Sequence, residues 1–205
     1  MKKRIFNETK LVIASHNKGK IREITQLLKP LNIEILSAYD LGVDEPIENG
    51  NTFEENALIK SSFVSKKTNL PSLSDDSGIC FLDLGGEPGI YSARWAGQNK
   101  DFKLAMSKIY ENLKNIQNPT YSCYFTCSLS LCWPDGHHVT VSGSVYGKFA
   151  WPPKGKKGFG YDPVFIPLGK KQTFGQMSPE YKHRISHRHK AFKKLNKLCF
   201  PNLIM

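Results

Sequence analysis

Several features are missing from this chain of 205 residues, and each absence excludes a class of protein. No apolar run approaches the length needed to span a bilayer, so we expect no membrane segment. The basic start is not followed by an apolar stretch, so we expect no secretory signal and a cytoplasmic location. The five cysteines include no C-x-x-C pair, which argues against zinc and favours buried free thiols.

The chain also lacks the phosphate-binding motif G-x-x-x-x-G-K-[ST]. It has a different pattern that favours phosphate. A short apolar strand over 10–14 leads into a polar turn, and a helix is predicted over 18–28. The N–H groups and the positive dipole at the start of a helix attract anions, and lysines add full charge. We therefore predict a phosphate site in the segment Ser15, His16, Asn17, Lys18, Gly19 and Lys20.

Acidic residues are scarce relative to basic ones. The 29 lysines and arginines against 18 aspartates and glutamates give a net charge of +11. Such a charge is typical of proteins that bind nucleic acid, a membrane surface or a phosphorylated small molecule. Three basic groups flank glycine or aromatic motifs: Lys18 with Lys20, the loop 154–157, and the segment 182–190. The remaining lysines are scattered, as is typical of solvated faces.

The order of predicted elements indicates an α/β fold with an elongated mixed sheet. The first half alternates strands and helices, including a strand over 33–36 and a helix that extends to about Lys66, with Thr52 as its expected N-cap. Short strands are expected over 71–74 and 79–82, and Asn99 is expected to cap a further helix. Two long antiparallel strands, a short strand and a basic helix follow, over 121–133, 138–151, 162–166 and 186–198. No linker or repeat divides the chain, so we expect one domain over 1–205 with two lobes around a central cleft.

Two acidic segments are candidates for a metal site. Asp75 and Asp76 are adjacent, and adjacent side chains on a strand point to opposite faces, so one of them is expected to serve a given site. An exposed turn is the alternative for this Asp-Asp-Ser-Gly segment. A second acidic segment at 44–50 contains Glu48. Oxygen ligands from two segments beside a phosphate site are suited to Mg²⁺, which keeps several waters and bridges to phosphates.

Three further positions have both a functional and a structural interpretation. Lys60 shares a helix face with Asn56 and can reach a phosphate, or it is an ordinary surface lysine. The segment 158–163 offers Phe159 for stacking on a purine and Asp162 for hydrogen bonding, or it is a turn with core aromatics. His187 and Arg188 are donors for a purine carbonyl, or ordinary charges at a helix end. A metal pair of His183 with His187 is disfavoured by the neighbouring basic residues.

Taken in order, these segments resemble the inosine triphosphate pyrophosphatase family, also called the Ham1 family, in its bacterial form. The resemblance covers nearly the whole chain, and its most specific part is the run from Leu84 to Arg94. The other matching segments are 15–20, 48–50 with 52–57, 74–78, 158–163 and 185–188.

The resemblance implies a fold, an activity and a set of roles. It implies an α/β homodimer that hydrolyses dITP, ITP, XTP and dXTP to the monophosphate and pyrophosphate, with one or more Mg²⁺ ions per subunit. Asp76 is implied as the proton acceptor, and Glu48 and Asp76 as the metal ligands. The implied substrate-binding residues are Ser15, His16, Asn17, Lys18, Gly19, Lys20, Lys60, Ser77, Phe159, Gly160, Tyr161, Asp162, Lys182, His187 and Arg188.

Two other functions compete with this interpretation. A basic nucleic-acid-binding protein without hydrolase activity explains the charge and the aromatic residues, but it leaves Glu48 and Asp76 without a role. A different phosphate enzyme, such as a kinase, needs an acceptor site, and the kinase motifs are absent. We therefore expect a purine nucleoside triphosphate as the partner, and neither nucleic acid nor a membrane.

Overall fold

The computed structural model describes residues 4–201. Among them, six strands form one sheet in the order β2-β1-β3-β4-β5-β6. β1 is parallel to β2 and β3, whereas β5 and β6 are antiparallel, so the sheet is mixed as predicted. The strands are β1 (Lys10–Ala14), β2 (Glu34–Ser37), β3 (Ser72–Phe81), β4 (Ser122–Cys132), β5 (His138–Phe149) and β6 (Phe165–Pro167).

The helices are α1 (Lys18–Leu28), α2 (Phe53–Thr68), α3 (Ser92–Trp95), α4 (Phe102–Lys114), α5 (Pro179–Ile185) and α6 (His187–Cys199). None of these helices, within residues 4–201, is long and apolar enough to cross a membrane. Short 3₁₀ turns connect several elements.

The described chain divides into two compact units. Unit 1 contains residues 4–76, 127–143 and 188–201, and unit 2 contains residues 77–126 and 144–187. Three strands therefore contribute residues to both units: β3, β4 and β5. The expectation of two lobes is met by these units, and the central cleft stays a prediction.

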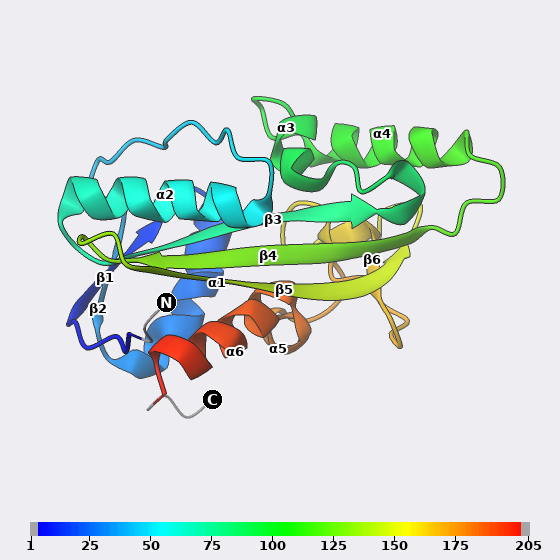
Figure 1. Cartoon of the computed structure of the whole chain (residues 1–205). Helices are drawn as coiled ribbons and strands as arrows, with labels where there is room; N and C mark the ends of the chain where they lie inside the picture. The colour runs from blue at the N-terminus through cyan, green and yellow to red at the C-terminus, as the bar shows by residue number, and fades with distance from the viewer. Residues whose placement is uncertain (1–3, 202–205) are drawn as a thin grey trace. The chain divides into compact units, whose positions relative to one another are not determined.

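Unit 1 has helices on both faces of its strands, and the alternation of β1 explains why (Figure 1). Leu11 and Ile13 of β1 join a core cluster with α1 and α6. Val12 and Ala14 point to the other face and join Val64 of α2. These four side chains are buried, whereas Lys10 at the start of β1 is exposed, as expected for a parallel strand covered on both faces.

Unit 2 has its own hydrophobic core, which is rich in aromatic side chains. Met106, Ile109 and Leu113 of α4 recur at helical spacing on its buried face, and they lie in this core. Phe125 of β4 contacts Phe165 of β6, with ring centroids 4.8 Å apart. Aromatic residues of the second half of the chain therefore fill the core of unit 2.

Three predicted boundaries are wrong. β3 is one continuous strand, whereas two short strands around a turn were expected, because the strand lies between β1 and β4 in the sheet. α4 is capped by Asp101, whose carboxylate accepts from Lys103 N and Leu104 N, and not by Asn99. The short strand expected over 162–166 begins only at Phe165, because Asp162–Val164 forms a 3₁₀ turn, whereas the basic helix expected over 186–198 is found as α6.

Candidate active site

The turn between β1 and α1 is built by Asn17. Its side-chain oxygen accepts from the backbone N–H groups of Gly19 and Lys20, at 2.9 and 3.2 Å, and so caps the helix. Ser15 Oγ in turn accepts from Asn17 N at 3.1 Å. These caps occupy two of the helix N–H groups that were expected to face an anion. The phosphate site predicted for this turn would therefore depend mainly on its lysine side chains.

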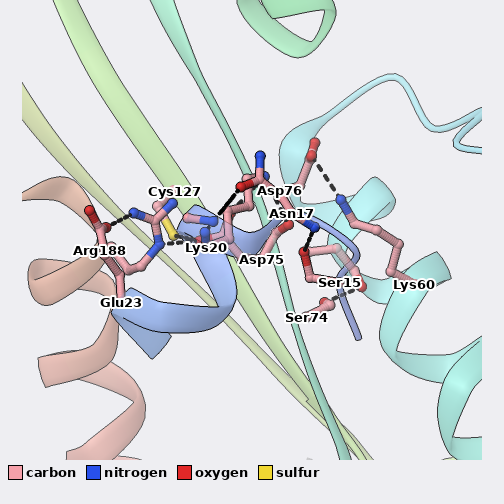
Figure 2. A network of polar contacts seen from close by, with 12 residues as sticks. Ser15, Asn17, Lys20, Glu23, Lys60, Ser74, Asp75, Asp76, Cys127 and Arg188 are labelled. Carbon is pink, nitrogen blue, oxygen red and sulfur yellow. Dashed lines mark hydrogen bonds and ion pairs between the residues drawn. The ribbon is translucent and has the colours of Figure 1, made fainter. Parts of the chain in front are cut away.

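Asp76 is the buried acid of the candidate site, and its side chain lies beside Lys60 (Figure 2). Lys60 Nζ donates to Asp76 Oδ1 at 3.0 Å and lies 2.6 Å from Glu48 Oε1. Among residues 4–201, Asp76 Oδ2 finds no hydrogen-bond partner, and it is buried. The sequence left open whether Lys60 was a surface lysine, and the structure shows it buried between two carboxylates.

The loop that carries Glu48 is held by α2. Asn56 is fully buried, and its side-chain oxygen accepts from Gly50 N at 2.9 Å. A Cβ atom on Gly50 would lie 2.8 Å from that same oxygen, so this close approach requires glycine. Thr52 caps α2 by accepting from Glu55 N at 3.1 Å, as predicted. The residues before α2 therefore set the position of Glu48.

For both Asp76 and Lys60, burial and the neighbouring opposite charges shift the pKa in opposite directions. Burial raises the pKa of Asp76 above its ordinary value, and the nearby ammonium groups of Lys60 and Lys20 offset this only in part. Burial lowers the pKa of Lys60, but the carboxylates of Asp76 and Glu48 outweigh it, so the pKa is raised overall. Asp76 is therefore a stronger base than an exposed aspartate, and Lys60 stays charged.

The carboxylate oxygens at this position are suitable ligands for a magnesium ion. Glu48 and Asp76 supply hard oxygen atoms, and Asp76 Oδ2 is buried without a partner, which a cation would correct. Within residues 4–201, no group of three or more His, Cys, Asp and Glu side chains is arranged to hold a metal. Two carboxylates leave most positions of an octahedral ion to water and phosphate oxygens, which is usual for Mg²⁺ at nucleotide sites.

Asp75 points away from Asp76 and binds a different set of side chains (Figure 2). Its Oδ1 lies 2.9 Å from Lys20 Nζ, and its Oδ2 accepts from Arg188 Nε at 2.7 Å. Cys127 Sγ donates to the same Oδ2 at 3.0 Å. Arg188 also donates through Nη1 to Glu23 of α1. The prediction that adjacent acids face different partners is confirmed.

The cluster around Asp75 is buried and charged. Burial would raise the pKa of Asp75, but the positive charges of Arg188 and Lys20 hold it well below its ordinary value. The pKa of Cys127 is raised well above its ordinary value, by burial and then by the charge of Asp75, so the thiol stays protonated and can donate. Asp75 is therefore ionised and fully partnered within unit 1.

In unit 2, Asp162 and Lys182 form a buried pair. Lys182 Nζ donates to Asp162 Oδ2 at 2.6 Å, and the same oxygen accepts from Phe159 N at 2.7 Å. The ammonium also lies 4.7 Å from the centre of the Phe159 ring. Gly158 has a φ of +76°, and a Cβ atom there would lie 2.0 Å from Asp162 Oδ2. The predicted base-binding residues Phe159, Asp162 and Lys182 thus lie together.

Other residues of the predicted base-binding set contact different partners. The Tyr161 side chain is buried in the core of unit 2 and donates to Ser92 O at 2.8 Å. The His187 ring stacks on Phe125 with centroids 4.9 Å apart. Arg188 belongs to unit 1, where it binds Asp75 and Glu23. Its role toward the base stays a prediction, and so do the roles of Gly160 and Ser77.

Two partners in the Asp75 cluster were missed by sequence reasoning, Glu23 and Cys127. Glu23 lies 165 positions from Arg188 along the chain, and Cys127 lies 52 positions from Asp75. Glu23 carries no local motif, and Cys127 was assigned only as a buried thiol. Pairing over such distances depends on the fold, so no local pattern in one sequence could have shown it.

Together, the mixed α/β sheet, the lysine-bearing βα turn and the buried acid beside a lysine define the class of a phosphate-handling α/β enzyme. The profile of the Ham1 family matches residues 11–198, and the chain belongs to this family.

The chain is similar to bacterial proteins over nearly its full length. It is 49% identical over 199 residues to a dITP/XTP pyrophosphatase of Zymomonas mobilis, which covers 97% of this chain and 95% of that protein. It is 47% identical to a dITP/XTP pyrophosphatase of Rhizobium meliloti, with 96% and 98% covered. A solved structure of a HAM1 protein from Coxiella burnetii superposes with a TM-score of 0.85 at 34% identity, covering 93% of this chain and 98% of that one.

Proposed function

We propose that this protein hydrolyses deaminated purine nucleoside triphosphates, namely dITP, ITP, XTP and dXTP, to the monophosphate and pyrophosphate. The observation that carries this proposal is Asp76, a buried acid with an unpartnered oxygen beside Lys60, in a chain of the Ham1 family. The names of the bacterial relatives support the substrate class. The nucleic-acid alternative leaves this buried pair without a purpose.

The chemistry assigned to Asp76 is that of a general base. Asp76 Oδ2 accepts a proton from a water molecule whose oxygen attacks the α-phosphorus. The new P–O bond forms as the bond between the α-phosphorus and the bridging oxygen breaks, and pyrophosphate leaves with that oxygen. The raised pKa of Asp76 supports this role, because a base gains strength as its pKa rises. No nucleophilic Ser, Cys or His is needed, so no covalent intermediate is proposed.

Lysines are assigned to the charge of the triphosphate. Lys18, Lys20 and Lys60 bind the phosphate oxygens, and Glu48 and Asp76 are the residues that would hold Mg²⁺. When bound, this ion neutralises the charge that develops on the leaving pyrophosphate. The burial of Lys60 supports its part, because its positive charge is weakly screened there.

Recognition of the base is assigned to residues of unit 2. Hypoxanthine and xanthine have a carbonyl at position six, where adenine has an amino group. The ammonium of Lys182 can donate to that carbonyl but has nothing to accept from an amine. A buried mismatch of this kind discriminates by roughly 10⁴-fold. The pairing of Lys182 with Asp162 supports this assignment, because it fixes the donor beside the Phe159 ring.

The remaining assignments rest on the family resemblance and the sequence. They are a homodimer, a cytoplasmic location, and substrate contacts from Ser15, His16, Asn17, Gly19, Ser77, Gly160, Tyr161 and His187. The dimer is tested by the mass of the purified protein in solution. The contacts are tested by soaking or co-crystallisation with a slowly hydrolysed ITP analogue.

The decisive experiment is a product assay with ITP, XTP, dITP, GTP and ATP in the presence of Mg²⁺. We expect monophosphate and pyrophosphate from the first three, and much slower turnover of ATP and GTP. Equal turnover of ATP and ITP, or orthophosphate as the first product, would overturn the proposal. A salt-dependent gel shift with nucleic acid and no triphosphatase activity would support the alternative instead.

A further inference from the structure

The Asp75 cluster joins four elements of unit 1. Asp75 comes from β3, Lys20 and Glu23 from α1, Cys127 from β4, and Arg188 from the start of α6. Asp75 and Arg188 are each about 1% exposed, which is extreme for charged residues. The catalytic mechanism proposed above does not use the Asp75 carboxylate or its hydrogen bonds. A buried charged cluster that performs no chemistry requires another explanation.

Lys20 belongs both to the Asp75 cluster and to the segment 15–20, which is the predicted phosphate site. It lies in the first turn of α1, and its ammonium makes two contacts with Asp75, one to Oδ1 at 2.9 Å and one to the backbone oxygen at 3.3 Å. A lysine has three N–H donors, so these contacts leave one for a ligand. A free lysine side chain loses rotamer entropy when it is fixed in one conformation. Because Asp75 already fixes Lys20 in the folded protein, this entropy is lost on folding and does not oppose phosphate binding.

We propose that Asp75 is a positioning residue for triphosphate binding: it holds the Lys20 ammonium in place, and Arg188 and Glu23 hold Asp75. This inference rests on the proposed function, because it assigns Lys20 to the phosphates. It gives the two adjacent aspartates separate tasks. Asp76 acts in the chemical step, and Asp75 acts in binding.

The rest of the cluster explains why Asp75 itself does not move. Arg188 Nε and Cys127 Sγ both donate to Oδ2, so the oxygen opposite Lys20 is fixed from two other elements. Glu23 takes a second N–H of Arg188 and lies on the same helix as Lys20. The cluster contains two cations and two carboxylates, so its charges balance. Arg188 thereby ties the start of α6 to the helix that carries the phosphate turn.

The test is steady-state kinetics of the full-length protein with ITP and Mg²⁺. We expect Asp75→Asn to raise KM by about 10- to 100-fold while kcat changes by less than about threefold. Asp76→Asn should show the opposite pattern, a large loss of kcat. The inference is overturned if Asp75→Asn lowers kcat and leaves KM unchanged. Ser61→Ala is the matched control, because it removes a buried hydrogen bond to Ser130 in the same unit and should leave KM unchanged.

A double-mutant cycle separates positioning from general loss of structure. Lys20→Met should raise KM by itself, and adding Asp75→Asn should then raise it by less than about threefold. Effects that multiply in the double variant would show that Asp75 acts independently of Lys20, and would overturn the inference.

Binding of inorganic tripolyphosphate, measured by calorimetry, keeps this inference separate from the proposed function. A protein that does not hydrolyse ITP, yet binds tripolyphosphate more weakly after Asp75→Asn, would refute the function and support the positioning role. If the wild-type protein hydrolyses ITP and Asp75→Asn leaves KM unchanged, the proposed function is supported and the positioning role is refuted.

One measurement does not require a folded variant. In the wild-type protein, the side-chain ammonium of Lys20 should give an NMR signal that exchanges with water more slowly than that of Lys18, which is exposed on the same turn. Equal exchange of the two lysines would overturn the inference.

Discussion

Asp75 and Asp76 are neighbours in β3, yet their carboxylates bind different cations: Asp75 binds Arg188 at 2.7 Å, and Asp76 binds Lys60 at 3.0 Å. The alternation of side chains along a strand separates them. One strand therefore presents a fully partnered acid and an acid with a buried, unpartnered oxygen. Several predictions of function depend on this difference.

Replacing the acid with the unpartnered oxygen should remove catalysis. Asp76→Asn is expected to fold and to bind ITP, because asparagine has nearly the same volume. Its kcat should fall by roughly 10²- to 10⁴-fold, since the amide cannot accept the proton of the attacking water. Single-turnover kinetics check the chemical step directly. Retained kcat in Asp76→Asn would show that another group is the base.

Base selection and phosphate binding should respond to different lysines. Lys182→Met should lower kcat/KM for ITP and narrow the ratio of ITP to ATP, because the donor that opposes the adenine amine is lost. Lys20→Met should weaken ITP and GTP by similar factors. Lys170→Met is a matched control, since Lys170 is exposed and lies 5.4 Å from the ring centre of Tyr181. The hypothesis fails if Lys20→Met changes base preference and Lys182→Met does not.

Arg188 is also predicted to contact the base, and kinetics can separate that role from its role in holding Asp75. If Arg188 reads the base, Arg188→Ala narrows the ratio of ITP to ATP. If it acts only through Asp75, that variant raises KM for both substrates equally. The structural contacts with Asp75 and Glu23 lead us to expect the second result.

Chelation should abolish activity. We expect EDTA to stop ITP hydrolysis and Mg²⁺ to restore it, because Glu48 and Asp76 offer hard oxygen ligands. Glu48→Gln should raise the Mg²⁺ concentration required for half-maximal activity more than it changes base preference. A titration of Mg²⁺ with each substrate measures both quantities. Full activity in a metal-free assay would contradict this assignment.

The Asp75 cluster should also be visible in acid unfolding. Asp75→Asn removes one partner of a buried ion pair, which typically costs about 3–5 kcal/mol of unfolding free energy at neutral pH. The folded-state pKa of Asp75 is lowered, so its contribution is present above the unfolded pKa of about 3.9 and is lost as pH falls toward the folded value. The difference between wild type and variant should therefore shrink below that pH.

Denaturant unfolding at several pH values measures this difference. Ser61→Ala serves again as the control, because neither serine of that bond titrates in this range. A difference that stays constant down to acid pH would show that the charge of Asp75 does not contribute to stability.

Local sequence patterns predicted much of this fold. The helix over 18–28, the Thr52 cap and the hairpin of β4 and β5 all depend on residues close together in the chain. The Asp-Asp-Ser-Gly stretch misled the prediction, because its polarity is typical of a turn. Its carboxylates are buried only since Arg188 and Lys60 reach them from distant segments. Tertiary ion pairs allow a polar segment to form a central strand, and sequence alone did not show those pairs.

For the candidate site too, individual residues were predicted from the sequence, but some of their pairings were not. Lys20, Lys60, Glu48 and Asp76 were named from motifs, and the structure brings Lys60, Glu48 and Asp76 together. The pairing of Asp162 with Lys182 was not foreseen, although both residues were named, because 20 positions separate them. The structure explains why position 158 is glycine. Its φ is positive, and the carboxylate of Asp162 leaves no room for a side chain.

The register of β3 has a consequence for how this family can change. β1 pairs with β3 in parallel, with Val12 opposite Ser72 and Ala14 opposite Ser74. Inserting a single residue between Ser74 and Asp75, or deleting Ser74, would turn each aspartate toward the face of the sheet on which the other's partners lie. Arg188 would then face the acid meant for proton transfer, and Lys60 the acid meant for anchoring. Point substitutions can tune this enzyme gradually, but a change of length at that place exchanges two tasks in one step.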